Sequence, residues 1–176
     1  HMGADGFRWY ARNGGGVTRW KEGWRTWDVT NGLPSSRIYA IRELQGRMWV
    51  GTALGPARLE GDRWVPLPEP GGWTHGPVRA LAVHGQEGNY DVWVAADAGL
   101  GHYQAGSWRW FGTADGLPSE KCATLMEEPE AGRLWVGTQK GLACLEVGRW
   151  KVWRSPEDLP HPSVHRLALS RTPEGG

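Results

Sequence analysis

The chain has 176 residues, a length typical of one domain. Its 20 Lys and Arg residues balance 19 Asp and Glu, and the two signs are interspersed. Charge therefore gives no reason to propose nucleic acid or a membrane as the partner. No apolar run approaches the roughly 20 residues that a membrane-spanning helix needs. We interpret His1-Met2 as a cloning remnant and expect residues 3–176 to form a single domain.

The composition indicates many short strands rather than helices. The chain contains 13 Trp, 27 Gly and 12 Pro, but two Phe and three Met. Abundant Gly and Pro with regularly placed aromatic residues is typical of strands joined by tight turns. The two cysteines, Cys122 and Cys144, are too few for a disulfide framework or a four-cysteine metal site. We expect both to be buried thiols.

The sequence repeats itself with a period of about 42 residues. The Trp-Val-Gly-Thr stretch at 49–52 recurs at 135–138 and, as Trp-Val-Ala-Ala, at 93–96, and residues 9–12 form a degenerate copy. A second series of tryptophans follows a short turn in each repeat: Trp24, Trp64, Trp108 and Trp150. A third landmark is the Asn-Gly-Leu-Pro-Ser stretch at 31–35, with copies at 115–119 and, more loosely, 158–160; the second repeat has Pro70-Gly71-Gly72-Trp73 instead. Three landmarks in one order predict four copies of one structural unit.

Each full repeat predicts four strands, bounded by residues that favour chain reversal. The chain begins with three strands, at 8–11, 17–20 and 24–28. Three full repeats follow, with predicted strands at 38–44, 48–52, 57–60 and 63–67; at 78–83, 92–96, 101–104 and 107–111; and at 122–126, 134–138, 143–146 and 149–153. A lone first strand is predicted at 164–169. Because no stretch keeps an apolar period of 3.6, we expect little helix.

These units predict an all-β fold, a β-propeller with blades of four antiparallel strands and four blades per chain. A sheet of this size cannot bury both faces alone, whereas stacking copies around an axis buries them and protects the ends. Tryptophans on the second and fourth strands suit the space between blades. We therefore interpret Trp49, Trp93 and Trp135 as inter-blade core rather than as a platform for an aromatic ligand.

The phase of the repeats predicts how the ring closes. The N-terminal unit lacks a first strand, the C-terminal strand at 164–169 lacks a partner, and the tail at 173–176 resembles the turn at 129–132. Unpaired strand edges favour pairing, so we expect the two terminal parts to complete one blade. Closure within one molecule gives a four-bladed ring, and closure between two molecules gives an eight-bladed homodimer, both within the range known for propellers. A third alternative is that the repeats are part of a longer chain.

Three stretches carry a resemblance to a known family: Leu-Trp-Val-Gly-Thr at 134–138, Gly-Leu at 141–142 and Asp-Gly-Leu-Pro-Ser at 115–119. Together they resemble the two-component regulator propeller repeat. The resemblance implies a sensor propeller of a bacterial signalling protein and an extracytoplasmic (periplasmic) location, which the residues themselves leave open. It also implies larger sets of repeats than the four found here, which favours the eight-bladed homodimer over the closed monomer.

The candidate binding face holds the connections from fourth to first strands and from second to third strands, since loops on a rigid scaffold often carry function. One column at the start of the first strands is regular and predicts core: Ile38, Val78, Cys122 and Val164. The next column varies: Tyr39, Arg79, Ala123 and His165. From this face we select seven candidate ligand-binding residues: Arg37, Tyr39, His75, Arg79, Lys121, His161 and His165.

No catalytic residue, metal site or cofactor is predicted. The histidines lack metal-ligand spacing, and His161 and His165 fall in a loop interrupted by Pro162. The leading hypothesis is a non-catalytic recognition or sensor propeller that binds a small molecule, glycan or protein. One alternative is an excised or engineered set of repeats that assembles into an eight-bladed ring without a ligand. Another is a propeller lyase or hydrolase, for which the face offers mainly His165, Glu120 and Arg79.

Overall fold

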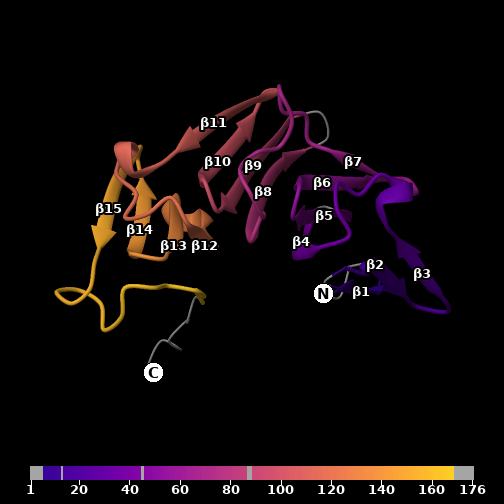
Figure 1. The fold of residues 1–176 in the computed structure, drawn as a ribbon, viewed down its shortest axis with the longest axis horizontal. Helices are drawn as coiled ribbons and strands as arrows, with labels where there is room; N and C mark the ends of the chain where they lie inside the picture. Colours follow the sequence, from indigo (N-terminus) through magenta and orange to yellow (C-terminus); the bar gives the residue numbers. More distant parts are fainter. Residues whose placement is uncertain (1–5, 13, 45, 87–88, 169–176) are drawn as a thin grey trace.

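The computed structural model describes residues 6–12, 14–44, 46–86 and 89–168, and these form strands and short 3-10 turns (Figure 1). The N-terminal sheet has three antiparallel strands in the order β1 (Arg8–Arg12), β2 (Gly16–Trp20) and β3 (Trp24–Trp27). It corresponds to the second, third and fourth strands of a repeat, as predicted. None of the described residues belongs to a helix long and apolar enough to span a membrane.

Each of the three full repeats forms one four-stranded antiparallel sheet in which neighbours in sequence are neighbours in space. The first contains β4 (Ile38–Leu44), β5 (Arg47–Thr52), β6 (Gly55–Glu60) and β7 (Arg63–Pro66). The second contains β8 (Ala80–Gln86), β9 (Asn89–Ala96), β10 (Gly99–Gln104) and β11 (Ser107–Phe111). The third contains β12 (Cys122–Glu128), β13 (Arg133–Thr138), β14 (Gly141–Glu146) and β15 (Arg149–Trp153). Three 3-10 turns lie at Val29–Asn31, Thr113–Asp115 and Pro129–Ala131.

The sheets stand side by side in an open arch, with first strands on the inside and fourth strands on the outside (Figure 1). β8 contacts both β4 and β12, so neighbouring first strands line one inner wall. After β15 the chain turns back toward the inside of the arch. This is the arrangement of propeller blades, and no sheet of the described residues joins the two ends of the arch.

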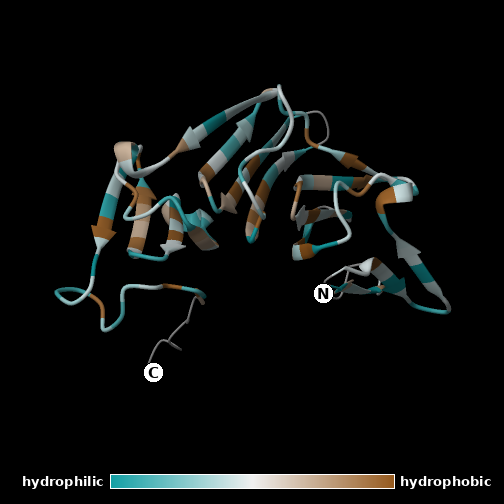
Figure 2. Cartoon of the chain, viewed as in Figure 1, coloured by the Kyte–Doolittle hydropathy of each residue, from teal (hydrophilic) through white to brown (hydrophobic). Residues whose placement is uncertain are grey.

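The core lies between the sheets. Hydrophobic residues form bands on the strands of every sheet, whereas the outer hairpin between β2 and β3 is hydrophilic (Figure 2). Trp9 and Trp27 of the N-terminal sheet pack against Val50 and Trp64 of the next. Similar apolar clusters fill the other two junctions. Burial of apolar surface between sheets therefore holds the arch together.

The predicted tryptophan core is confirmed in part. Trp49 is buried between its own sheet and the sheet β8–β11. Trp93 is half-buried and packs against the cluster that joins β8–β11 to β12–β15. Trp135 is also half-buried and stacks on Trp153. Trp24 differs from its repeat equivalent Trp64, because Trp24 is exposed and Trp64 is buried. The reason is that no sheet precedes β1–β3 among the described residues.

The Trp-Val-Gly-Thr motif has a physical explanation at each of its last two positions. The buried hydroxyl of Thr52 donates to the carbonyl of Gly55 at 2.8 Å and accepts from the amide of Leu54 at 3.0 Å, which closes the turn between β5 and β6. Thr138 makes the same pair of bonds before β14. A side chain at Gly51 would lie 2.6 Å from the carbonyl oxygen of Val78, so glycine lets the next first strand approach.

The Asn-Gly-Leu-Pro-Ser motif forms the connection from one sheet to the next. A 3-10 turn at Val29–Asn31 ends at Gly32, which has a left-handed backbone with φ of 91°. A side chain there would collide with the carbonyl of Trp64, so the turn requires glycine. Leu33 then enters the core between the first two sheets. The copy at 115–119 repeats this design, with Gly116 at φ of 112° and Leu117 buried.

The predicted strand at 164–169 is not a strand in its described part, residues 164–168, while Leu169 and the tail at 173–176 lie outside the described residues. The amide of Val164 nevertheless donates to the carbonyl of Thr138 at 2.9 Å, as the amide of Val78 donates to that of Thr52 at 2.9 Å. Val164 therefore stands where the next first strand would begin. A strand needs a ladder of hydrogen bonds with a neighbour, and no described segment supplies one.

Candidate functional site

The two kinds of connection that the sequence analysis assigned to one face do lie together, because they are hydrogen-bonded to each other. The amide of Ala53, in the turn between β5 and β6, donates to the carbonyl of Arg37 at 3.0 Å. Gln139, in the turn between β13 and β14, donates in the same way to the carbonyl of Lys121 at 3.1 Å. Turns between second and third strands thus pack on the residues that lead into the first strands.

The variable column occupies irregular positions at the start of the first strands. The pairing register shifts between Ile38 and Ala40, so Tyr39 is an extra residue at a β-bulge. Ala123 holds the same position in β12. In the sheet between them, Arg79 precedes β8 and its amide donates to the carbonyl of Ala95 at 2.9 Å. Bulges re-aim side chains, which explains why this column does not belong to the core.

Three of the predicted residues line one hollow of about 150 Å³ between the sheets β8–β11 and β12–β15. They are Arg79, Lys121 and His165. A larger hollow of about 530 Å³ shares Asp97, Lys121 and Gln139 with the first, so the two hollows adjoin each other at these residues. It extends along the connection after β11 and the turn before β14. We call the combined depression the Lys121 hollow.

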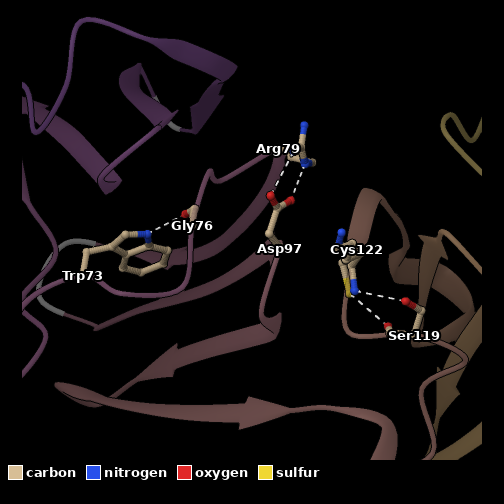
Figure 3. Close-up of polar contacts among 7 residues, drawn as sticks. Trp73, Gly76, Arg79, Asp97, Ser119 and Cys122 are labelled. Carbon is tan, nitrogen blue, oxygen red and sulfur yellow. Dashed lines mark hydrogen bonds and ion pairs between the residues drawn. The ribbon is translucent and has the colours of Figure 1, made fainter.

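Arg79 and Asp97 form a two-pronged ion pair at the rim of the Lys121 hollow (Figure 3). The Nε and Nη2 atoms of Arg79 donate to the two oxygens of Asp97 at 2.6 and 3.1 Å. This pairing raises the pKa of Arg79 above its usual value. The guanidinium also lies 5.8 Å from the centre of the Tyr39 ring, which places that predicted residue beside the hollow.

His165 enters the hollow from the segment after β15. Its Nε2 atom lies 2.9 Å from the hydroxyl of Ser163, which helps to orient the ring. His161 has a different role, because its Nδ1 atom accepts a hydrogen bond from the amide of Ser163 at 3.1 Å and thereby stabilises the turn. His161 is not among the residues that line the hollow.

His75 and Arg37 are likewise not brought into the hollow. The His75 ring stacks on Trp110 with centroids 3.6 Å apart, and its Nε2 atom lies 2.8 Å from Glu69. These contacts pack the connection between β7 and β8 onto the outer strand β11. Arg37 is exposed, and its backbone carbonyl accepts the bond from Ala53.

The structure adds residues that the sequence analysis missed: Asp97, Gln139 and Lys140. All three lie in the turns between second and third strands. Their position directly after the Trp-Val motif could have identified them, since these turns were already assigned to the binding face. The repeats also differ there in charge, with Asp97 in one turn and Lys140 in another.

The site offers little for catalysis. Cys122 lines the hollow, but burial raises the pKa of its thiol to about 12, which keeps it protonated and unreactive. Both oxygens of Asp97 are occupied by Arg79. Glu120 accepts from the hydroxyl of Thr113 at 3.4 Å. Within the described ranges, no group of three or more His, Cys, Asp or Glu side chains is placed to hold a metal ion.

Solved structures resemble this chain over most of its length. The extracellular domain of BT3049 from B. thetaiotaomicron, assigned as a hybrid two-component system, matches 93% of this chain and 23% of its own at a TM-score of 0.72 and 18% identity. The extracellular domain of BT4673 from the same organism, assigned as a one-component system, matches 89% of this chain and 22% of its own at a TM-score of 0.70 and 18% identity. This likeness shows that the chain shares the fold of these domains. The predicted resemblance to the two-component regulator propeller repeat is thus confirmed in the fold.

The fold also occurs outside sensors. An ancestral GH74 enzyme matches 86% of this chain and 23% of its own at a TM-score of 0.64 and 16% identity. This chain therefore spans less than a quarter of each of these three proteins. No protein-family model matches the sequence, and no curated protein does so.

Proposed function

We propose that this chain is a non-catalytic recognition domain of an extracytoplasmic sensor, and that it binds a small polar ligand with an anionic group in the Lys121 hollow. The observation that carries the proposal is the convergence of Arg79, Lys121 and His165, from three successive repeats, on one hollow. Its larger part, about 530 Å³, has the size of a small-molecule site.

The charges of the hollow favour an anion. The three cations Arg79, Lys121 and Lys140 outnumber the two carboxylates Asp97 and Glu120, so the lining keeps a positive excess. His165 and the side-chain amide of Gln139 lie beside it. A carboxylate on a sugar or metabolite would receive hydrogen bonds from these groups, and a charged partner makes such bonds stronger than neutral ones. Neutral parts of the ligand would contact Pro118 and Ala123.

The comparison with solved structures supports the extracytoplasmic part of the proposal. The two sensor structures that resemble this chain are extracellular domains. An extracytoplasmic recognition domain meets ligands before they enter the cell, which is the role of a sensor. The hydrolase alternative has no observation in its favour beyond the shared fold of the GH74 enzyme.

The proposed ring closes through the terminal parts of the chain. Among the described residues the sheet β1–β3 has three strands and no first strand, and residues 164–168 stand in the place of one without forming a strand. Pairing of this segment with β1 would complete a four-stranded blade and remove two exposed strand edges.

The test is a binding measurement with a matched pair of sugars, glucuronate and glucose. We expect titration calorimetry to detect glucuronate and not glucose, with affinity falling at least about 10-fold for Lys121→Gln, since one charge-assisted hydrogen bond contributes roughly 1.5–3 kcal/mol. Arg63→Gln, which removes an exposed cation outside the hollow, should leave binding unchanged. Equal binding of glucose, or no loss in Lys121→Gln, would contradict the proposal.

A further inference from the structure

The outer face of the N-terminal sheet carries an exposed aromatic cluster. Tyr10, Trp20 and Trp24 are 42%, 36% and 69% exposed, respectively. Their rings are in contact, with Trp24 centred 5.8 Å from Tyr10 and 6.2 Å from Trp20. Contiguous exposed apolar surface of this kind indicates an interaction site. We call these three residues the leading face.

The strand register identifies the residues of the other sheets that are equivalent to the leading face. In the N-terminal sheet Trp20 pairs with Trp24, as Leu59 pairs with Trp64 in the following sheet. Leu59 and Trp64 pack against the preceding sheet. The equivalent residues of the third sheet, Tyr103 and Trp108, also pack toward the sheet before them. The leading face therefore occupies positions that a preceding blade covers elsewhere in the molecule.

The opposite end of the chain presents the matching surface. In the N-terminal sheet, Trp9 and Trp27 stack with centroids 5.5 Å apart and cover Trp64 of the next sheet. In the last sheet, Trp135 and Trp153 stack with centroids 5.2 Å apart. Trp135 aligns with Trp9 in the repeat, and no further sheet follows it among the described residues. We call the Trp135 and Trp153 pair the trailing face.

A segment that stands where the next first strand would begin accompanies the trailing face. Val164 is anchored to Thr138, and Leu167 and Ala168 line the same inner hollow as the first strands β4, β8 and β12. Residues 164–168 therefore stand in the row of first strands, with their outer edge open. The sheet β1–β3 has a free edge at β1, because none of the described segments pairs with that side of the strand.

We infer that a second copy of this chain covers both ends: the trailing face of each copy packs on the leading face of the other, and residues 164–168 pair with β1. This inference rests on the ring closure proposed above and names its partner. The result is an eight-bladed ring with a two-fold axis, in which both junctions are the same.

The curvature of the arch favours a second copy over closure within one chain. The two faces lie at opposite ends of an open arch (Figure 1). Closing four blades would require each junction to turn about a quarter circle, twice the turn of an eight-bladed ring, and close-packed junctions resist such a change. The likeness to BT3049 spans 93% of this chain, so arches of this curvature occur within a much longer chain.

The contact consists of two junctions and two strand pairings. Each junction brings together three aromatic side chains of the leading face and two of the trailing face. A large aromatic side chain has roughly 150–250 Å² to bury, and on the leading face 36–69% of each side chain is still exposed. The aromatic surface available to the two junctions is therefore on the order of several hundred Å², and pairing of residues 164–168 with β1 adds to it toward the roughly 1,200–2,000 Å² of stable interfaces.

Light scattering on the purified chain tests the inference. We expect a mass twice the 19.5 kDa of one chain, and a fall to 19.5 kDa in Trp24→Glu. Trp153→Glu, at the other end, should have the same effect. Leu54→Glu is the matched control, because Leu54 is exposed on the turn between β5 and β6, and it should remain a dimer. Far-ultraviolet circular dichroism confirms that each variant keeps its sheets.

Two results would overturn the inference: a mass of 19.5 kDa for the unchanged chain at tens of micromolar, or a dimer that survives both Trp24→Glu and Trp153→Glu. Failure here is distinguishable from failure of the recognition proposal. Apart from His165, the Lys121 hollow is lined by two complete sheets of one chain, and Lys121→Gln leaves the leading and trailing faces unchanged, so glucuronate binding and mass are separate readouts.

Discussion

Arg79 donates hydrogen bonds to both carboxylate oxygens of Asp97, and this ion pair connects the residue before β8 to the turn between β9 and β10. The two residues lie 18 positions apart and neither is part of a strand. Both side chains are more than a third exposed, so the pair contributes less than about 1 kcal/mol to stability. Its larger effect is on the charge that the Lys121 hollow presents to a ligand.

Replacing Asp97 with Asn should strengthen anion binding. The change releases the guanidinium of Arg79, which then adds a bidentate donor beside the ammonium of Lys121. We expect the Kd for glucuronate to fall several-fold, measured by titration calorimetry. Asp62→Asn is the control, because it removes a carboxylate that pairs with Arg25 outside the hollow. An unchanged or weaker affinity in Asp97→Asn would show that the ligand does not contact Arg79.

Replacing Gly137 with Ala should weaken the junction between the last sheet and residues 164–168. The new methyl group would lie 2.7 Å from the carbonyl oxygen of Val164 and 2.6 Å from the side chain of Thr124. Overpacking of this kind costs about 1–3 kcal/mol, which urea unfolding would detect. Gly23→Ala should have little effect, since nothing lies near its added carbon. Equal stability of the two variants would refute the steric role of Gly137.

Replacing Thr138 with Val should destabilise the turn between β13 and β14. Valine keeps the shape but leaves the carbonyl of Gly141 and the amide of Lys140 without the hydroxyl that they share. Because Thr138 is fully buried, we expect a loss of about 1–3 kcal/mol in the free energy of unfolding. The exposed Thr74 supplies the comparison, and Thr74→Val should shift stability by less than about 0.5 kcal/mol.

Glu127 should make stability depend on pH. Burial raises the pKa of its carboxyl group above 4.5, although the hydrogen bond from His84 on β8 opposes the shift. A raised folded pKa gives stability that is full below the unfolded value and is lost as pH rises through the folded value. Relative to Glu127→Gln, the unchanged chain should therefore lose stability as pH rises from 4.5 toward neutrality. Urea unfolding at several pH values measures this difference, with the exposed Glu157→Gln as control; a constant difference would contradict it.

The strands were predictable because their signals are local. Residues 107–111 and 149–153 were predicted with the bounds that the structure shows, since turn residues flank an apolar alternation. The repeat also placed Arg79, Ala123 and His165 in one column of the binding face, and in the structure these three line the same hollow. Lys121 followed from the same reasoning about the binding face.

Other features depend on neighbours that a single sequence does not reveal. His75 was predicted to bind a ligand, yet its ring is stacked on Trp110, which lies 35 positions away in the chain. Asp97 was missed because its importance comes from Arg79 across a turn. Contacts of this kind form only when separate strands are brought together, so the residue pattern within one strand or turn cannot predict them.

The sequence by itself determined the unit: four repeats, their strands, and the glycines and threonines that shape their turns, because these depend on backbone conformation and on residues close in the chain. Only the tertiary structure decided the environment of each unit. Trp24 and Trp64 share one repeat position, but Trp24 is exposed and Trp64 is buried. The physical reason is that burial requires an adjacent sheet, and that neighbour is supplied by the arch and not by the repeat itself.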